Sequence, residues 1–185
     1  MNLSILPNDL PKPIDDQACN HLINKQIPDI SLPNQDGNLL KLNRSDTFRL
    51  IIYCYPMTGH PNRPLPKNWD SIPGARGCTP ETCSFRDSHD KFIALNAVPI
   101  GLSTQSIPDI KEMTTRLKVP YDVVSDEHLI FAKQLKLPTF KIEDRVYIKR
   151  LTLIVEKSLI KHFFYPVFPP DLHVKEVLQW LDSNK

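Results

Sequence analysis

One stretch constrains the fold of this chain more than any other: the apolar run FRLIIYCY at residues 48–55, which Pro56 follows. Its β-branched and aromatic residues favour a strand, and beyond Arg49 the run has no polar alternation that would mark a face open to water. A strand of this kind is buried on both faces of its sheet. The run therefore predicts a central strand in a sheet that helices cover on both sides.

Strand and helix patterns alternate around this run. Residues 30–42, ISLPNQDGNLLKL, predict a β-hairpin about the turn signal NQDG. Further strands or extended segments are expected at residues 97–104, 122–126, 147–155 and 159–167, and helices at residues 79–95, 106–119, 127–137 and 169–185. The pattern predicts one α/β domain at residues 24–185, with a mixed central β-sheet flanked by helices on both faces, and an N-terminal extension at residues 1–23.

The composition narrows the classes of partner. The chain of 185 residues has a net charge of +2, which gives no electrostatic reason to expect a nucleic acid or a membrane surface as partner. The N-terminus lacks a basic stretch followed by an apolar one, and residues 50–55 are too few to span a bilayer. We therefore expect a cytoplasmic protein without nucleic-acid or membrane partners. In such a reducing compartment, neighbouring cysteines are more often catalytic, redox-active or metal-binding than structural disulfides.

Residues 57–77, MTGHPNRPLPKNWDSIPGARG, contain four prolines and three glycines and show no helix or strand period. A segment of this length without secondary structure is usually functional or disordered. Trp69 among the prolines would suit a docking surface for another protein. The alternative, a rigid surface loop whose φ angles are fixed by proline, is the one we favour.

Cys78 and Cys83 flank the start of the helix expected from residue 79, with Thr79 as a candidate N-cap. A thiol at a helix N-terminus faces unpaired N–H groups and the positive end of the helix dipole, which lower its pKa and favour the thiolate. In a regular helix a separation of five residues rotates by ~140° and rises ~7.5 Å, whereas a disulfide needs Cα atoms about 4.4–6.8 Å apart. The pair can therefore bond only if the first helical turns unwind.

Two other interpretations of this pair remain open. Free cysteines also serve as small buried hydrophobes, which is the interpretation we favour for Cys19 and Cys54. The spacing C-x4-C opens one iron–sulfur pattern, but that pattern needs a further cysteine where Arg86 stands, and His89 alone would not complete a zinc site. We therefore expect no metal and no cofactor.

Arg150 is a charged residue within YIKRLTLIV, the otherwise apolar strand expected at residues 147–155. One interpretation is that its guanidinium reaches solvent from the face of the strand. Close to the helix-start cysteine, it would instead stabilise a thiolate and bind a polar oxygen substrate. Arg76, in the loop before Cys78, is a competing candidate for this role.

The decapeptide CTPETCSFRD, at residues 78–87, resembles the C-T-x-E-x-C-x-F-R-D signature of the peroxiredoxin Q or bacterioferritin-comigratory-protein branch (AhpC/TSA) of the peroxiredoxins. Supporting segments follow in order along residues 27–182, among them VPIGLST, VVSDEHLIFAKQLKL and RLTLIV. The resemblance implies a thioredoxin-like fold. It also implies a thiol-dependent peroxidase that reduces hydrogen peroxide and organic hydroperoxides.

The resemblance assigns roles to four residues. Cys78 matches the peroxidatic cysteine and Cys83 the resolving cysteine. Arg150 matches the family arginine that hydrogen-bonds the thiolate and the peroxide, and Glu81 matches the glutamate of the motif. Cys78 would thus become a sulfenic acid, and Cys83 would condense with it to an intramolecular disulfide that a thioredoxin-like dithiol reduces.

The chain departs from the family in the loop, where the family pattern is P-x-x-x-T-x-x-C. Counting back from Cys78, Ala75 stands at the threonine position and Ser71 at the proline position. Pro56 still follows the central strand, and Thr58 comes two residues later. We expect residues 57–77 to be an insertion that loops out and leaves Thr58 facing Cys78.

The expected enzyme is an atypical 2-Cys, thioredoxin-dependent peroxidase. Both thiols lie on one chain, so a monomer or weak dimer is sufficient for turnover. Two other functions stay open on the same fold. One is a thiol–disulfide oxidoreductase without peroxide specificity, and the other is a redox-sensing interaction module that presents residues 57–77 to a partner.

Overall fold

The computed structural model describes residues 6–7, 9–44 and 48–184. Part of the extension expected at residues 1–23 and the last residue of the expected C-terminal helix lie outside these ranges. The main sheet has five strands in the order β5–β4–β3–β8–β9. These are β5 (Val123–Ser125), β4 (Ala97–Ser103), β3 (Arg49–Cys54), β8 (Leu151–Glu156) and β9 (Leu159–Phe164).

Strand β3 lies at the centre of this sheet, as its apolar run predicts. It pairs in parallel with β4 and antiparallel with β8, so that Tyr53 lies between Gly101 and Thr152. Residues 50–54 are all buried. Because β4 is parallel to β5 and β8 is antiparallel to β9, the sheet is mixed.

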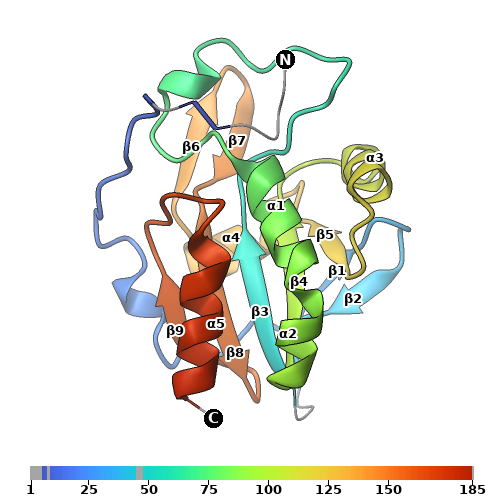
Figure 1. The fold of residues 1–185 in the computed structure, drawn as a ribbon, viewed down its shortest axis with the longest axis vertical. Helices are drawn as coiled ribbons and strands as arrows, with labels where there is room; N and C mark the ends of the chain where they lie inside the picture. The colour runs from blue at the N-terminus through green and yellow to red at the C-terminus, as the bar shows by residue number, and fades with distance from the viewer. Residues whose placement is uncertain (1–5, 8, 45–47, 185) are drawn as a thin grey trace.

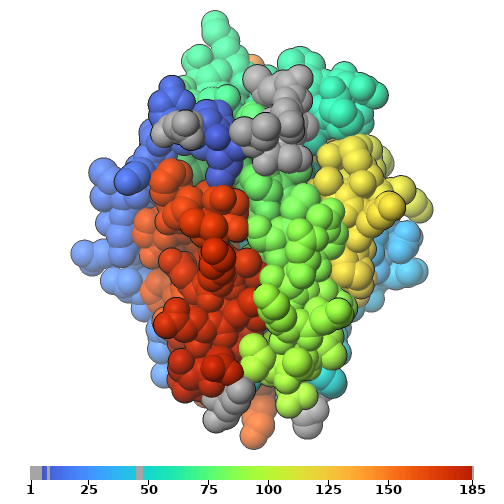
Figure 2. Space-filling view, in the orientation of Figure 1, coloured from blue at the N-terminus to red at the C-terminus, as the bar shows by residue number. Residues whose placement is uncertain are grey.

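Successive side chains of β3 point to opposite faces and enter two separate cores. Ile51 and Tyr53 pack with α1 (Cys78–Asp87), α2 (His89–Ala94), α5 (His173–Ser183) and the inner side of α3 (Ile107–Leu117). Leu50 and Ile52 pack with α4 (Ile130–Leu135), with η1 (Asn20–Leu22) and with the hairpin of β1 (Ser31–Pro33) and β2 (Leu39–Lys41). Figures 1 and 2 show α5 and the α1–α2 pair side by side over one face of the sheet. Within the described ranges, no helix is long and apolar enough to cross a membrane.

A second hairpin, of β6 (Thr139–Ile142) and β7 (Arg145–Ile148), is absent from the elements expected from the sequence. The strand expected at residues 147–155 is two strands, because the chain bends at Lys149 and Arg150 between β7 and β8. Phe140 and Tyr147 of the hairpin pack against Trp69 of the 57–77 segment and form a third, smaller core. The segment is thus anchored, and it contains the short helix η2 (Trp69–Ser71).

The helix expected at residues 79–95 is likewise two helices, with Ser88 between α1 and α2. Helix α1 begins at Cys78 with Gly77 as N-cap, which corrects the expectation that Thr79 takes this position. Gly77 has a φ of +106°, and a Cβ there would meet Pro170 Cγ at 2.3 Å, so only glycine fits at the N-cap of α1. At the start of α3, Ser106 is the N-cap and accepts a hydrogen bond from the Asp109 N–H.

The ends of other expected elements also differ. Strand β9 ends at Phe164, whereas a strand to residue 167 was expected. Helix α5 begins at His173, whereas a helix from residue 169 was expected. The helix expected at residues 127–137 extends only over Ile130–Leu135. Helix α4 lies between two residues with positive φ, Leu129 and Lys136, and β9 ends one residue before the Tyr165–Pro166 bond.

Candidate active site

Cys78 is the first residue of α1 and only 2% of it is exposed to solvent. Its sulfur lies 3.1 Å from Nη2 of Arg150. The main-chain N–H of Met57, just beyond β3, also favours the thiolate form of this sulfur and so lowers its pKa. In the thiol form, the S–H group donates to the carbonyl of Ala75 at 3.5 Å. Groups from two separate parts of the chain therefore favour the thiolate of one sulfur.

Arg150 holds this arrangement together from the bend between β7 and β8. Its side chain is buried, which rules out the solvent-facing interpretation. Nη1 donates to Oε2 of Glu81 in an ion pair, and Nη2 also donates to the carbonyls of Gly74 at 3.3 Å, Ala75 at 3.3 Å and Arg76 at 3.1 Å. The guanidinium thus joins the sheet, the loop before Cys78 and the first turn of α1.

Arg76 does not take the place of Arg150. Its side chain is buried and forms an ion pair with Asp70 at 3.4 Å, within the 57–77 segment. The main-chain carbonyl of Arg76, and not its guanidinium, contributes to the surroundings of Arg150. Of the two candidate arginines, the structure brings Arg150 to the thiol.

Burial and charge act against each other at this site. Burial raises the pKa of the Cys78 thiol above its ordinary value, while the Arg150 guanidinium and the Met57 N–H oppose that rise. Burial also raises the pKa of Glu81 to about 7, although Arg150 favours the carboxylate. Burial thus opposes the lowering of the Cys78 pKa that is expected from its place at the helix start.

Cys83 lies five residues further along the same regular helix and is partly exposed. Both cysteines are free thiols. Burial raises the pKa of the Cys83 thiol, and Arg86 opposes this. Since both residues belong to α1, a bond between them requires the first turns of α1 to unwind.

Pro56 and Thr58 are both buried close to the end of β3. The Thr58 hydroxyl donates to Oε1 of Gln105 at 3.0 Å, and the Thr58 N–H donates to the same oxygen at 2.8 Å. The amide of Gln105 donates in return to the Thr58 carbonyl at 3.2 Å. The expectation that Thr58 faces Cys78 is therefore wrong in this structure, because the Thr58 hydroxyl binds Gln105.

A small cavity lies against the thiol, and the 57–77 segment supplies much of its wall. The lining residues are Met57, Gly59, Leu65, Trp69, Arg76, Gly77, Cys78 and Thr79. Only 2% of Trp69 is exposed, so it is not available for the protein docking that its sequence context suggested. Sequence reasoning missed Met57, Leu65 and Gln105. Gln105 alone carried a signal, since it follows β4 at the carboxyl edge of the sheet, where ligands of α/β proteins bind.

Cys19 and Cys54 are completely buried in the core on the other side of the sheet, as expected for small hydrophobes. Burial raises the pKa of Cys19 to about 12 and that of Cys54 well above its ordinary value. Neither thiol is poised for chemistry. Among the described residues, no three His, Cys, Asp or Glu side chains are grouped as metal ligands would be.

Residues 22–181 match the family described as Redoxin. Among curated proteins, the chain is 28% identical over 157 residues to a chloroplastic peroxiredoxin Q of Oryza sativa subsp. japonica, covering 84% of this chain and 64% of that protein. It is 28% identical over 159 residues to a chloroplastic peroxiredoxin Q of Sedum lineare, covering 85% and 76%. The chain thus spans less than two thirds of the length of the rice protein.

Solved structures show the same fold. Peroxidoxin BcpB from Mycobacterium tuberculosis superposes with a TM-score of 0.73 at 21% identity, covering 88% of this chain and 97% of that one. A cysteine-to-serine mutant of PrxQ from Xylella fastidiosa superposes with a TM-score of 0.71 at 20% identity, covering 88% and 96%. The thioredoxin-like fold is therefore confirmed.

Proposed function

The chain belongs to the redoxin family, and from that membership we propose that it is a thiol-dependent peroxidase that reduces hydroperoxides at Cys78. One observation carries the proposal: a buried cysteine at a helix N-terminus has its sulfur 3.1 Å from the guanidinium of Arg150. A thiolate held by a fixed cation is the nucleophile that peroxide reduction requires. The similarity to chloroplastic peroxiredoxin Q proteins supports the same activity.

The reaction at Cys78 transfers one oxygen atom. The thiolate attacks the terminal oxygen of the hydroperoxide, a sulfur–oxygen bond forms and the oxygen–oxygen bond breaks. The sulfur becomes a sulfenic acid, and the leaving alkoxide or hydroxide takes up a proton to become an alcohol or water. Nη2 of Arg150 points at the reacting sulfur, so its positive charge stabilises the negative charge that moves from sulfur to oxygen.

Glu81 acts through Arg150 and not by touching the peroxide. Its carboxylate, which is 0% exposed, binds Nη1 and leaves Nη2 directed at Cys78 and the carbonyls of the loop. This single contact between Nη1 and Oε2 holds one end of the planar guanidinium in place. Glu81 is thus proposed as a positioning residue.

Cys83 is proposed as the resolving cysteine. Its thiol attacks the sulfenic acid sulfur of Cys78, water leaves, and an intramolecular disulfide forms after the start of α1 unwinds. A thioredoxin-like dithiol then reduces the disulfide by exchange and is itself oxidised. This makes the protein an atypical 2-Cys peroxidase that needs no partner subunit, in a monomer or weak dimer.

We propose that the protein works in a reducing compartment, the cytoplasm. The proposed cycle needs the disulfide of Cys78 and Cys83 to be reduced back to two thiols after each turnover. The peroxiredoxin Q relatives from rice and Sedum lineare are chloroplastic proteins. Fusion of the chain to a fluorescent protein would identify its compartment.

The test of the function is peroxide consumption by the wild type, Cys78→Ser and Cys83→Ser with thioredoxin and its reductase present. We expect Cys78→Ser to lose activity, and Cys83→Ser to complete one oxidation but not to cycle. Oxidation of Cys78 no faster than that of an ordinary free thiol would favour a thiol–disulfide oxidoreductase. Negligible turnover combined with binding of a partner that depends on oxidation state would favour the redox-sensing module.

A further inference from the structure

The 57–77 segment forms an open pocket of about 610 Å³ at the surface, outside the cavity at the thiol. Its apolar wall consists of Pro61, Pro64, Leu65, Pro66 and Trp69. The volume lies within the range of about 300–1,000 Å³ that is typical of sites for small organic ligands. We call it the insertion pocket.

Leu65 and Trp69 line both the insertion pocket and the small cavity at Cys78. A molecule in the insertion pocket is therefore separated from the thiol by the side chains of these two residues. Trp69 is fixed, because its ring packs against Tyr147 at 5.1 Å and Phe140 at 6.0 Å between ring centroids. Leu65 is only partly buried, so it is the side chain that can move aside.

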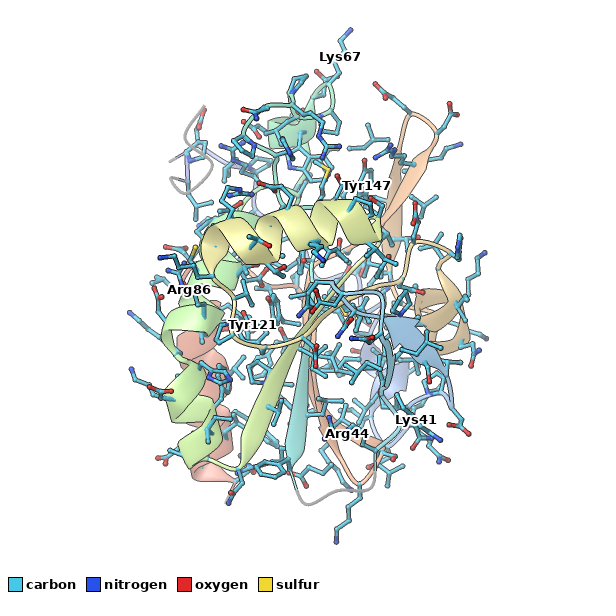
Figure 3. All side chains as sticks on the ribbon, turned by 90° about the vertical axis from the view of Figure 1, so that its right-hand side faces the viewer. Lys41, Arg44, Lys67, Arg86, Tyr121 and Tyr147 are labelled. Atoms are coloured by element: carbon cyan, nitrogen blue, oxygen red, sulfur yellow. The ribbon has the colours of Figure 1, made fainter. Side chains whose placement is uncertain are left out.

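The walls of the insertion pocket are also held in place before any ligand arrives. Prolines fix three of the φ angles around it. Arg63 forms an ion pair with Asp109 of α3, and Nη2 of Arg116 donates to the carbonyl of Gly59 at 3.1 Å. In Figure 3, Lys67 lies at the outer tip of the segment and points away from the molecule, while Tyr147 lies on its inner side. A preformed apolar pocket binds an apolar group without having to order its own walls.

We propose that the insertion pocket binds the alkyl or aryl part of an organic hydroperoxide, and that Leu65 is the residue that determines this specificity. The inference rests on the proposed peroxidase function of Cys78. The –OOH group passes Leu65 and Trp69 to the sulfur, its terminal oxygen is transferred to the thiolate, and the alkoxide is protonated to an alcohol that remains in the pocket until release. Hydrogen peroxide has no apolar part and gains nothing from these walls.

The first experiment compares cumene hydroperoxide with hydrogen peroxide. Quenched-flow mass spectrometry gives the second-order rate constant of Cys78 oxidation for the wild type, for Leu65→Trp, which fills the pocket, and for the matched control Leu39→Trp on exposed β2. We expect the ratio of the cumene to the hydrogen peroxide rate constant to fall about tenfold or more in Leu65→Trp, as for a lost apolar contact. The control ratio should stay that of the wild type.

The second experiment uses the native fold and so does not depend on how Leu65→Trp folds. Cumyl alcohol, the product, is titrated into Cys78→Ser protein while the indole N–H signals of the two tryptophans are followed by NMR. We expect the Trp69 signal to shift, whereas that of Trp180, on α5, stays in place. A Trp69 signal that does not move at saturating alcohol would overturn the proposal.

Failure of the pocket and failure of the function look different. If hydrogen peroxide oxidises Cys78 rapidly and the ratio in Leu65→Trp stays within about twofold of the wild type, only the pocket proposal is wrong. If neither peroxide oxidises Cys78 faster than an ordinary thiol, the peroxidase function is wrong, and the pocket proposal is wrong with it.

Discussion

Replacing Arg150 by glutamine tests the central contact of the proposed site. The variant removes the guanidinium whose Nη2 lies 3.1 Å from the Cys78 sulfur and whose Nη1 binds Glu81. The shorter amide carries no charge. We expect the variant to fold but to hold much less of Cys78 as thiolate at neutral pH.

The size of the effect follows from the distance. Two unit charges 3.1 Å apart attract by about 5 kcal/mol at an effective dielectric constant of about 20. Part of the lost attraction is offset in the variant. Without its cation, Glu81 takes up a proton and no longer repels the thiolate. If about half is lost, ~2.7 kcal/mol, the thiolate population falls about a hundredfold at a fixed pH.

The assay is stopped-flow oxidation of Cys78 by hydrogen peroxide in a Cys83→Ser background, with the pH profile of thiolate absorbance measured in parallel. The matched control is Arg49→Gln, which removes a guanidinium that binds the carbonyls of Leu181, Asn184 and Leu95 far from the thiol. We expect about a hundredfold slower oxidation for Arg150→Gln only. An Arg150→Gln protein that reacts as fast as the control would refute the reasoning.

Three further variants test the packing and charge of the site. Gly77→Ala should lose about 1–3 kcal/mol in thermal unfolding, because its Cβ would lie 2.3 Å from Pro170 Cγ; Gly37→Ala, with nothing within 4 Å, should lose less. The folded pKa of Glu81, about 7, lies above its unfolded value of 4.5, so its contribution to stability falls by about 3 kcal/mol as pH rises between these values. Denaturant unfolding of Glu81→Gln should lack this fall, and an unchanged pH profile would contradict it. The folded pKa of His173, about 4, lies below its unfolded 6.5, so its contribution, about 3 kcal/mol, is lost as pH falls through that window; His173→Asn should remove that loss.

The central sheet could be predicted because its signal is local. Because β3 is buried on both faces, its sequence is a continuous apolar run, and such a run by itself indicates a central strand. The thiol at the start of α1 was predictable for the same reason, since Cys78 and the proline two residues later mark a helix start. What such patterns cannot give is the depth at which the thiol lies.

That depth depends on residues far apart in the chain. Leu65 and Trp69 cover the thiol, and Trp69 is held by Phe140 and Tyr147 of a hairpin that the sequence did not reveal. The apolar character of residues 147–155 continues across the bend at Arg150, so the periodicity contains no break there. The bend depends on tertiary contacts. At the bend, the guanidinium of Arg150 turns inward to Glu81 and Cys78, which are distant in the sequence.

The Thr58 prediction failed for a related reason. Position along the chain placed Thr58 near the thiol, but a hydroxyl takes the partner that the fold provides, and here the side chain of Gln105 follows the neighbouring strand β4. The identity of that partner is set by the parallel pairing of β3 with β4 and not by any local sequence pattern.

The contacts of Arg150 affect the reorganisation energy of peroxide reduction, which is the free energy needed to rearrange the polar groups around the reacting sulfur. Of the five hydrogen bonds from its guanidinium, four go to Glu81 and to carbonyls, and one goes to Cys78. The cation is therefore set by groups whose charge the oxidation of sulfur does not change. Neither the guanidinium nor the groups that hold it must reorient when the thiolate forms or is consumed. The reorganisation energy of the chemical step therefore stays small.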